Sequence, residues 1–161
     1  MPTLSRKGIL AVAAVVDIAL QKDGRPIAAK TLAARHSFPS RYLELVLQRL
    51  VRDGILKGFR GPRGGYRLVR ERNGITAHDI LRAATKPETE GEPNSELVTK
   101  VVLPILSAAE QEFGQALSRI TLDDIARFAS LNGFETERRE IRGQVVGCDQ
   151  TILTVQRTSD S

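Results

Sequence analysis

The chain has little of what enzymes, membrane proteins and disulfide-rich domains rely on. It has one cysteine, no tryptophan and 4% aromatic residues in 161 positions. A single cysteine excludes an intrachain disulfide framework, and the scarcity of aromatics predicts an aliphatic core. No apolar run of about 18 residues occurs, so we expect no membrane-spanning helix. The absence of a Ser-His-acid set and of HExxH or CxxC spacings predicts a protein without catalytic residues, not an enzyme.

The apolar stretch Leu10–Leu20 follows two basic residues, as the core of a signal peptide would. It contains Asp17, however, and the residues after it are polar and offer no cleavage site. We therefore interpret it as the first helix of a folded domain and expect a cytoplasmic protein.

Positive charge is concentrated in the first half of the chain. Residues 1–72 contain 15 Lys and Arg against 5 Asp and Glu, whereas residues 73–161 contain 9 against 14. The first part is therefore +10 and the second −5. A basic region of this size is typical of proteins that bind nucleic acid.

The segment Phe59–Arg67 carries three arginines in nine residues and predicts a β-hairpin. Gly64 and Gly65 tolerate positive φ, so we expect the two strands to reverse there, with Pro62 stiffening the approach. An arginine-tipped loop suits contact with phosphates or with a narrow minor groove. An ordinary hairpin with a solvated tip has the same pattern. The predicted turn residues are Gly61, Pro62, Gly64 and Gly65.

Two helices precede this hairpin. We predict the first over Ala28–His36 and, after a break, the second from Ser40 as N-cap to about Asp53, where Gly54 ends it. The second helix has one apolar stripe and one basic face. The stripe contains Leu43, Leu47 and Leu50 with Val46 and Val51, and the basic face contains Arg41, Leu45, Gln48, Arg49 and Arg52. Helix, turn, helix and hairpin is the order of a winged helix-turn-helix.

The other elements are predicted to be helical, which makes the fold mainly α with a small β-hairpin wing (α+β). The expected helices are Ser5–Lys22, Thr76–Thr85 with Thr76 and Asp79 as a capping pair, and Thr121–Ser130 with Thr121 as cap. Residues 95–120 have an apolar stripe too wide for one small partner helix, so a second copy of the chain is the expected cover. Pro104 predicts a kink, or a helix that begins near Leu103.

Six blocks of sequence resemble a known family. They are Leu4–Gly8, Ser40–Glu44, Leu50–Leu56, Arg60–Leu68, Ile75–Ile80 and Ile120–Ile125. Together they resemble the IscR-like (Rrf2) family of bacterial winged-helix transcription regulators over roughly residues 1–130, and the RGPxGGYxL block is the most specific. A nucleotide-binding glycine loop is a poor alternative, because the Lys-Ser or Lys-Thr ending and the following helix are absent.

The resemblance implies a homodimeric, nucleoid-associated regulator that binds an imperfect palindrome in double-stranded DNA, and we expect a repressor. It implies a DNA-binding domain at 1–84, an acidic flexible loop at 85–96, dimerisation helices at 97–131 and an extension of uncertain structure at 132–161. The implied DNA contacts are Lys7, Pro39, Ser40, Arg41, Tyr42, Glu44, Leu45, Arg49, Lys57, Arg60 and Arg63. The dimer contacts predicted from the apolar stripe of residues 95–120 are Val101, Val102, Ile105, Leu106, Ala109, Phe113 and Leu117.

The chain departs from the family pattern at two places. Leu45 stands where a glutamine is expected, which suggests contact with a thymine methyl group in place of a hydrogen bond. Many relatives hold an iron–sulfur cluster with three cysteines between the fourth helix and the dimer helix, and residues 85–100 contain none. Thiolates are the ligands that such clusters require, so we expect no cofactor and no metal.

Three alternatives stay open. The first is oxidation of Cys148, which lies beyond the region of resemblance and is the candidate redox residue. The second is control by a protein or small-molecule effector, with the acidic segment 86–94 as its candidate contact. The third is an architectural protein that binds nucleic acid without sequence preference, against which Glu44 argues, because a carboxylate repels phosphate.

Overall fold

The computed structural model describes residues 4–85 and 95–134. Cys148, most of the acidic segment and most of the C-terminal extension lie outside the described residues. Among the residues that are described, no helix has the length and apolarity needed to cross a bilayer. The elements, in chain order, are α1 Arg6–Ala19, α2 Ala29–Arg35, α3 Ser40–Arg52, β1 Leu56–Phe59, β2 Gly65–Leu68, η2 Arg72–Gly74, α4 Ala77–Thr85, η3 Val98–Val102, α5 Leu103–Ser118 and α6 Leu122–Leu131.

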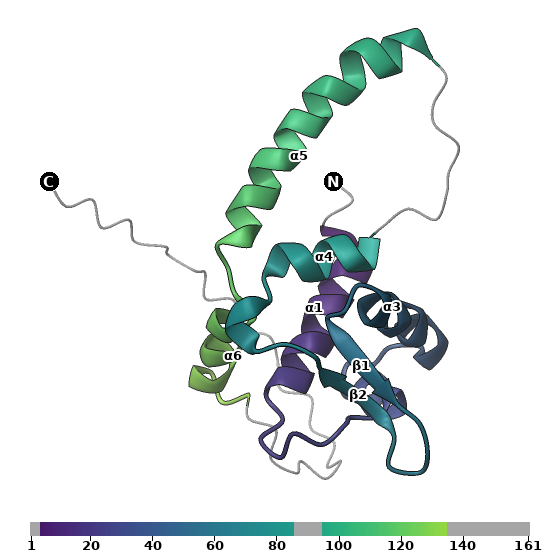
Figure 1. Ribbon diagram of the computed structural model, residues 1–161, viewed down its shortest axis with the longest axis vertical. Coiled ribbons are helices and arrows are strands. Elements are labelled where there is room, and N and C mark those ends of the chain that lie inside the picture. The colour runs from purple at the N-terminus through teal and green to yellow at the C-terminus, as the bar shows by residue number, and fades with distance from the viewer. Residues whose placement is uncertain (1–3, 86–94, 135–161) are drawn as a thin grey trace, which may run out of the picture.

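The core lies where α1 crosses the other helices of the body, by which we mean all elements except η3 and α5. Helix α1 contacts α3, α4 and α6 and also the wing strand β2. In Figure 1, α4 and α1 cross near the centre, and the wing lies beside α3. The fully buried large side chains are aliphatic, as the composition predicts: Leu32, Leu43, Leu47, Leu50, Ile55, Leu56, Ile75, Ile80, Leu122, Val15 and Val46.

Helix α3 has the predicted apolar stripe, but its N-cap differs from the prediction. Ser40 already has a helical backbone, and Pro39 is the N-cap with an extended φ of −61° and ψ of 121°. The carbonyl of Pro39 accepts from the backbone of Tyr42 and Leu43, and no side chain caps this end. The prediction of a Ser40 cap was therefore wrong by one position, because the fixed φ of proline suits the residue just before the first turn.

The C-terminus of α3 ends as predicted, at a glycine in the left-handed region. Gly54 has a φ of +71°, and its N–H donates to Val51 at 3.1 Å. The N–H of Ile55 donates to Leu50 at 2.9 Å, and both of these side chains are buried in the core. This pair of bonds is a Schellman motif, and it directs the chain from α3 straight into β1.

The wing is an antiparallel pair, but its turn is not at Gly64-Gly65. Phe59 pairs with Gly65, which places the reversal at residues 60–64. The N–H of Gly64 donates to the carbonyl of Gly61 at 2.9 Å, so Pro62 occupies the second turn position, where its φ is favoured. Gly61 takes the positive φ, of 102°. Gly64 is needed for a different reason, since a Cβ there would lie 2.3 Å from the carbonyl oxygen of Phe59.

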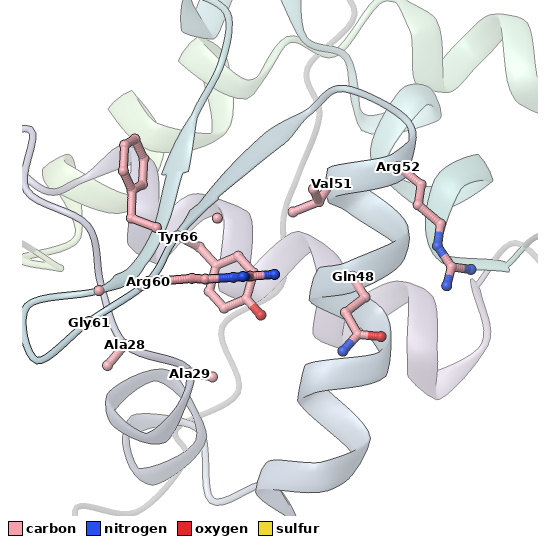
Figure 2. Close-up of a pocket in the computed structure, with 12 residues that line it drawn as sticks. Ala28, Ala29, Gln48, Val51, Arg52, Arg60, Gly61 and Tyr66 are labelled. Atoms are coloured by element: carbon pink, nitrogen blue, oxygen red, sulfur yellow. The ribbon is translucent and has the colours of Figure 1, made fainter.

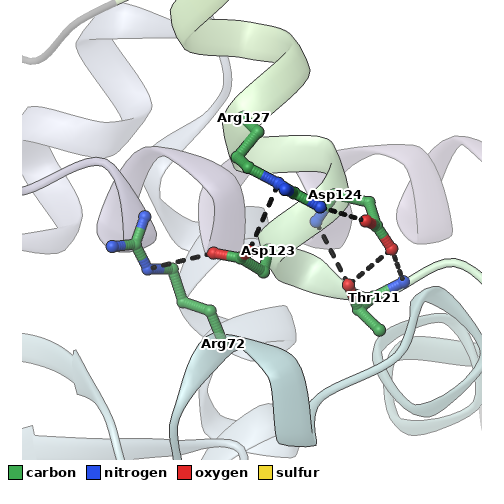
Figure 3. A network of polar contacts seen from close by, with 5 residues as sticks. All are labelled: Arg72, Thr121, Asp123, Asp124 and Arg127. Carbon is green, nitrogen blue, oxygen red and sulfur yellow. Dashed lines mark hydrogen bonds and ion pairs between the residues drawn. The ribbon is translucent and has the colours of Figure 1, made fainter.

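Helices α4 and α6 each begin with a capping box, and the two helix starts are joined to each other. Thr76 and Asp79 cap α4, as predicted, and Thr121 and Asp124 cap α6 in the same way. The two N-caps are bridged in antiparallel fashion, with Ala77 donating to Ile120 and Leu122 donating to Ile75 at 2.8 and 2.7 Å. Figure 3 shows how Asp123 adds ion pairs to Arg72 and Arg127 around the same point. The end of the long helix is thereby attached to the body.

Helix α5 extends away from the body (Figure 1) and is preceded by the single π-helical turn η3. The α-helical part begins at Leu103, which agrees with the second of the two predicted alternatives, and Pro104 lies in its first turn. Proline has no N–H and clashes with the preceding turn of an α-helix. The wider π turn accommodates this clash, so the helical path continues through Val98–Val102.

Helix α1 is shorter than the predicted Ser5–Lys22. Ser5 is its N-cap, and its hydroxyl accepts from Gly8, while the helix ends at Ala19. The N–H of Gln21 donates to Ile18 in a tighter turn, and Gly24 has a φ of +60°. The polar residues after Leu20 offer no apolar side chain to bury, so the helix gains nothing by continuing.

Candidate nucleic-acid interface

The face of α3 that is opposite to the core is solvent-exposed. Four predicted contact residues are exposed on it or at its start: Pro39, Ser40, Arg41 and Glu44. Leu45 is 56% exposed, so its isobutyl group is available for contact with a base. The exposed guanidinium, carboxylate and isobutyl groups can each contact a different base edge.

The turn between α2 and α3 fixes how that face is presented. Ser37 has a φ of 54°, the one non-glycine residue of the described chain with positive φ. Asp17 of α1 contacts the C-terminal end of α2. Its Oδ1 lies 2.6 Å from Nη1 of Arg35, and its Oδ2 lies 3.3 Å from Nε2 of His36. The position of α3 is therefore defined by the turn and by the ion pair between Asp17 and Arg35.

Arg49 has a different environment from the one the sequence predicts. Its guanidinium donates to the carbonyl of Ala84 at 3.0 Å and is only half-exposed. Ala84 lies in the last turn of α4, where carbonyl groups lack helical partners and favour a cation. Arg49 therefore connects α3 to α4.

Lys7 of α1 lies over the start of α3. Its Nζ is 5.7 Å from the ring centroid of Tyr42, a cation–π distance. Tyr42 is half-buried. The structure therefore brings together a predicted backbone contact from α1 and a predicted contact from α3.

The outer face of the wing carries a like-charge pair. Lys57 lies opposite Arg67 in the strand register, and both cations lie over the ring of Phe59, at 5.7 and 5.3 Å. Like charges that face each other across a hairpin are unfavourable for folding. A polyanion would relieve the repulsion. Arg63 and the turn residues Gly61 and Pro62 are exposed next to this pair, and Arg60 is also exposed but lines the groove on the other face of the wing.

The inner face of the wing contains Tyr66 and Gly58, which were not among the predicted site residues. Tyr66 pairs with Gly58 on the side of the hairpin that faces α3, where a groove of about 550 Å³ lies between the wing and the helix (Figure 2). The predicted reversal at Gly64-Gly65 implied the wrong strand register, so this pair was not apparent. A predicted reversal at residues 60–64 would have placed Tyr66 opposite Gly58.

The predicted dimer residues are largely exposed in the single chain. Ile105 is 65% exposed, Leu106 58% and Val101 47%, while Phe113 and Leu117 are half-buried nearer to the body. Val102 and Ala109 are also exposed. Monomeric proteins rarely expose a contiguous apolar surface of this kind.

No group of three His, Cys, Asp or Glu residues within 4–85 and 95–134 is placed to hold a metal ion. The donor set of the whole sequence does not fit a family-type iron–sulfur cluster either, because the chain has one cysteine and such clusters need several thiolates. Lys100, within residues 85–100, pairs with Glu96 one turn away.

The helix-turn-helix, the arginine-bearing wing and the basic face together define a winged helix-turn-helix DNA-binding protein. Comparison with known proteins gives the family. Residues 4–127 match the Rrf2 family model, described as an iron-dependent transcriptional regulator. The chain belongs to the Rrf2 family and is a DNA-binding transcriptional regulator.

Individual relatives agree with this assignment. A protein of Synechocystis sp. named as an HTH-type transcriptional regulator is 36% identical over 126 residues, which are 76% of this chain and 86% of that protein. IscR of Escherichia coli is 32% identical over 80 residues, about half of each chain.

Solved structures show the same fold. IscR from T. potens has a TM-score of 0.63 at 28% identity and covers 87% of this chain and 93% of its own. CymR, the global cysteine regulator of B. subtilis, has a TM-score of 0.58 at 28% identity and covers 78% and 96%.

Proposed function

We propose that the protein is a homodimeric repressor that recognises an imperfect palindrome through α3. The observation that carries this proposal is the exposed face of α3, which presents Arg41, Glu44 and Leu45 beside a basic wing. Arg41 would donate to guanine, Glu44 would accept from cytosine N4, and Leu45 would contact a thymine methyl group. Each good pair contributes about 1–3 kcal/mol of discrimination.

The flanking residues would contact the DNA backbone. Lys7, Lys57, Arg60 and Arg63 would neutralise phosphates or enter a narrow minor groove, while Pro39, Ser40 and Tyr42 would lie at the edge of the major groove. Two copies related by a two-fold axis would place their α3 helices about one helical turn apart on the duplex. Occupation of a promoter in this way would exclude polymerase, and this is why we favour repression.

The apolar face of η3 and α5 would pair with the same face of a second copy, and the symmetry of the palindrome follows from this pairing. We propose that DNA binding does not depend on a family-type cluster, because one cysteine per chain supplies too few thiolates. A signal would then reach the protein by another route, through an effector or through Cys148.

Selection from a random-sequence duplex pool tests the proposal. Wild-type protein should enrich a two-fold-related sequence and bind it at least about 1,000-fold more tightly than a scrambled duplex at physiological salt. Arg41→Ala should weaken binding to the selected duplex by about 5–150-fold, which corresponds to the 1–3 kcal/mol of one base contact. Lys7→Ala should weaken binding to both duplexes alike. Equal affinity of the wild type for both duplexes would contradict the proposal.

A further inference from the structure

The groove between the wing and α3 is lined by hydrogen-bond donors and bare backbone. Figure 2 shows the hydroxyl of Tyr66, the guanidinium of Arg60 and the amide of Gln48 lying toward one another over it. Arg52 lines the same groove further along α3. The facing wall is the backbone of the wing at Gly58, Gly61, Gly64 and Gly65.

The backbone of Tyr66 is paired on both sides, which fixes the point from which its side chain enters the groove. Its N–H donates to the carbonyl of Ile27 at 2.8 Å, and its own carbonyl accepts from Ile27 at 3.0 Å. On the other side, Tyr66 pairs with Gly58 in β1. Burial, and secondarily the charge of Glu44, raise the pKa of the Tyr66 phenol above its ordinary value of 10.0. The hydroxyl therefore keeps its proton at neutral pH and remains a donor.

Gly58 differs from the other three glycines of the groove. Gly61 and Gly65 have φ of +102° and +154°, and a Cβ at Gly64 would collide with the backbone. At Gly58, by contrast, φ is not in the left-handed region, and a Cβ would meet only Cε1 of Tyr66 at 3.8 Å, an ordinary contact. The fold therefore does not require a glycine at this position, whereas an open groove does.

We propose that this groove clamps one phosphodiester of the DNA backbone between the wing and α3. Tyr66, Gln48 and Arg60 would donate to its non-bridging oxygens, and three donors around bare backbone match a group that only accepts. The inference rests on the proposed DNA-binding function. A phosphate held there would fix α3 relative to the backbone and so set its register on the bases.

The partner is the phosphate of a duplex, in preference to a free phosphate ion. The carboxylate of Glu44 is close enough to act electrostatically on Tyr66. Its negative charge disfavours binding of a free anion in the groove, because such an anion has no other contacts to the protein. A phosphate within a duplex is positioned by the other contacts of α3 and the wing, so it tolerates that charge.

The duplex selected by the wild-type protein is the probe for this clamp. Tyr66→Phe should weaken binding about 3–10-fold, the effect of one hydrogen bond, without changing the slope of log K against log salt. Arg60→Gln should reduce that slope by about 1. Gly58→Ala should weaken binding about tenfold while melting at the wild-type temperature. The matched control is Gly74→Ala, in η2, where a Cβ meets nothing within 4 Å; it should bind like the wild type.

Single methylphosphonate substitutions in the selected duplex locate the clamped phosphate. At one position per half-site, removal of the phosphate charge should weaken binding by the wild-type protein. The same removal should weaken binding by Tyr66→Phe little further, because that variant has already lost a contact to this phosphate. Unchanged binding by both Tyr66→Phe and Gly58→Ala, with the selected duplex still preferred, would overturn the clamp and leave the proposed function intact. Saturable competition by millimolar inorganic phosphate, at ionic strength matched with chloride, would overturn the choice of the DNA backbone. Failure to select any sequence would instead remove the proposed function and the clamp with it.

Discussion

The body and the long helix place their aliphatic side chains in opposite environments. In α3, Leu43, Leu47 and Leu50 are completely buried within the chain. In α5, all of whose residues the structure describes, Gly114 is the single buried residue, and Ile105 and Leu106 are more than half exposed. A helix whose apolar side is uncovered gains little stability in a monomer. The comparison teaches that the body closes its own core, whereas the long helix needs another surface, and we propose that a second copy supplies it.

Truncation of a core leucine is the largest expected effect. Leu47→Ala should lower the free energy of unfolding by about 2–5 kcal/mol, because it leaves a cavity in the body. Ile105→Ala, measured below the concentration at which the chain dimerises, should cost less than about 0.5 kcal/mol. Chemical denaturation monitored by circular dichroism measures both variants. Similar losses in both variants would mean that α5 is already covered within one chain.

A charge on the exposed face of α5 should separate the two copies. Leu106→Asp would bury an unpaired carboxylate in the proposed interface, and the dimer dissociation constant should rise at least about 100-fold, or about 2.7 kcal/mol. Sedimentation equilibrium measures this constant. The matched control is Gln111→Asp, which places the same charge at another exposed position of the helix and should leave association unchanged.

The same contrast explains what the sequence could predict. The stripe of α3, the Gly54 stop and the Thr76 and Thr121 caps depend on residues within one or two turns, and they were predicted correctly. The turn of the wing was misplaced because several glycines compete for it, and steric contact with distant backbone decides between them. At Gly65, for example, a Cβ would lie 2.3 Å from the carbonyl oxygen of Ile27.

The candidate site was predictable where it depends on helix periodicity alone. Arg41, Glu44 and Leu45 are exposed on α3, as their spacing indicates. The bond from Arg49 to Ala84 joins residues 35 positions apart, so no local pattern reveals it. The pairing of Tyr66 with Gly58 depends in the same way on the strand register. Tertiary contacts therefore decide which basic residues are free to contact DNA.

Filling the joint between body and long helix should have an intermediate effect. A Cβ at Gly114 would lie 2.8 Å from Cε1 of His78 on α4, so Gly114→Ala should destabilise the fold by about 1–3 kcal/mol through overpacking. His78→Ala removes the obstructing ring, and the double variant should recover part of the loss. Thermal unfolding of the two single variants and the double variant measures the coupling. Strictly additive losses would show that α5 does not rest on His78.

The smallest expected effect is the pH dependence of the α6 cap. Hydrogen bonds from the side chain and then the backbone of Thr121, followed by a hydrogen bond from Arg127, lower the pKa of Asp124 below its ordinary value of 3.8. A lowered folded-state pKa stabilises the fold above the unfolded value, and this contribution is lost as the pH falls through the folded value. The melting temperatures of wild type and Asp124→Asn should therefore differ at pH 6 and converge below about pH 3.8. A constant difference down to pH 3 would show that the carboxylate charge plays no part.

The stoichiometry and half-site dependence of DNA binding test the central claim most directly. The selected duplex should bind two protomers, one per half-site, and scrambling one half-site should weaken binding at least about 100-fold, because several base contacts of about 1–3 kcal/mol each are lost together. Sedimentation velocity of the complex, combined with a titration of both duplexes, gives the two quantities. One protomer bound at full affinity, or equal affinity for the intact and the half-scrambled duplex, would contradict a dimeric reader of a palindrome.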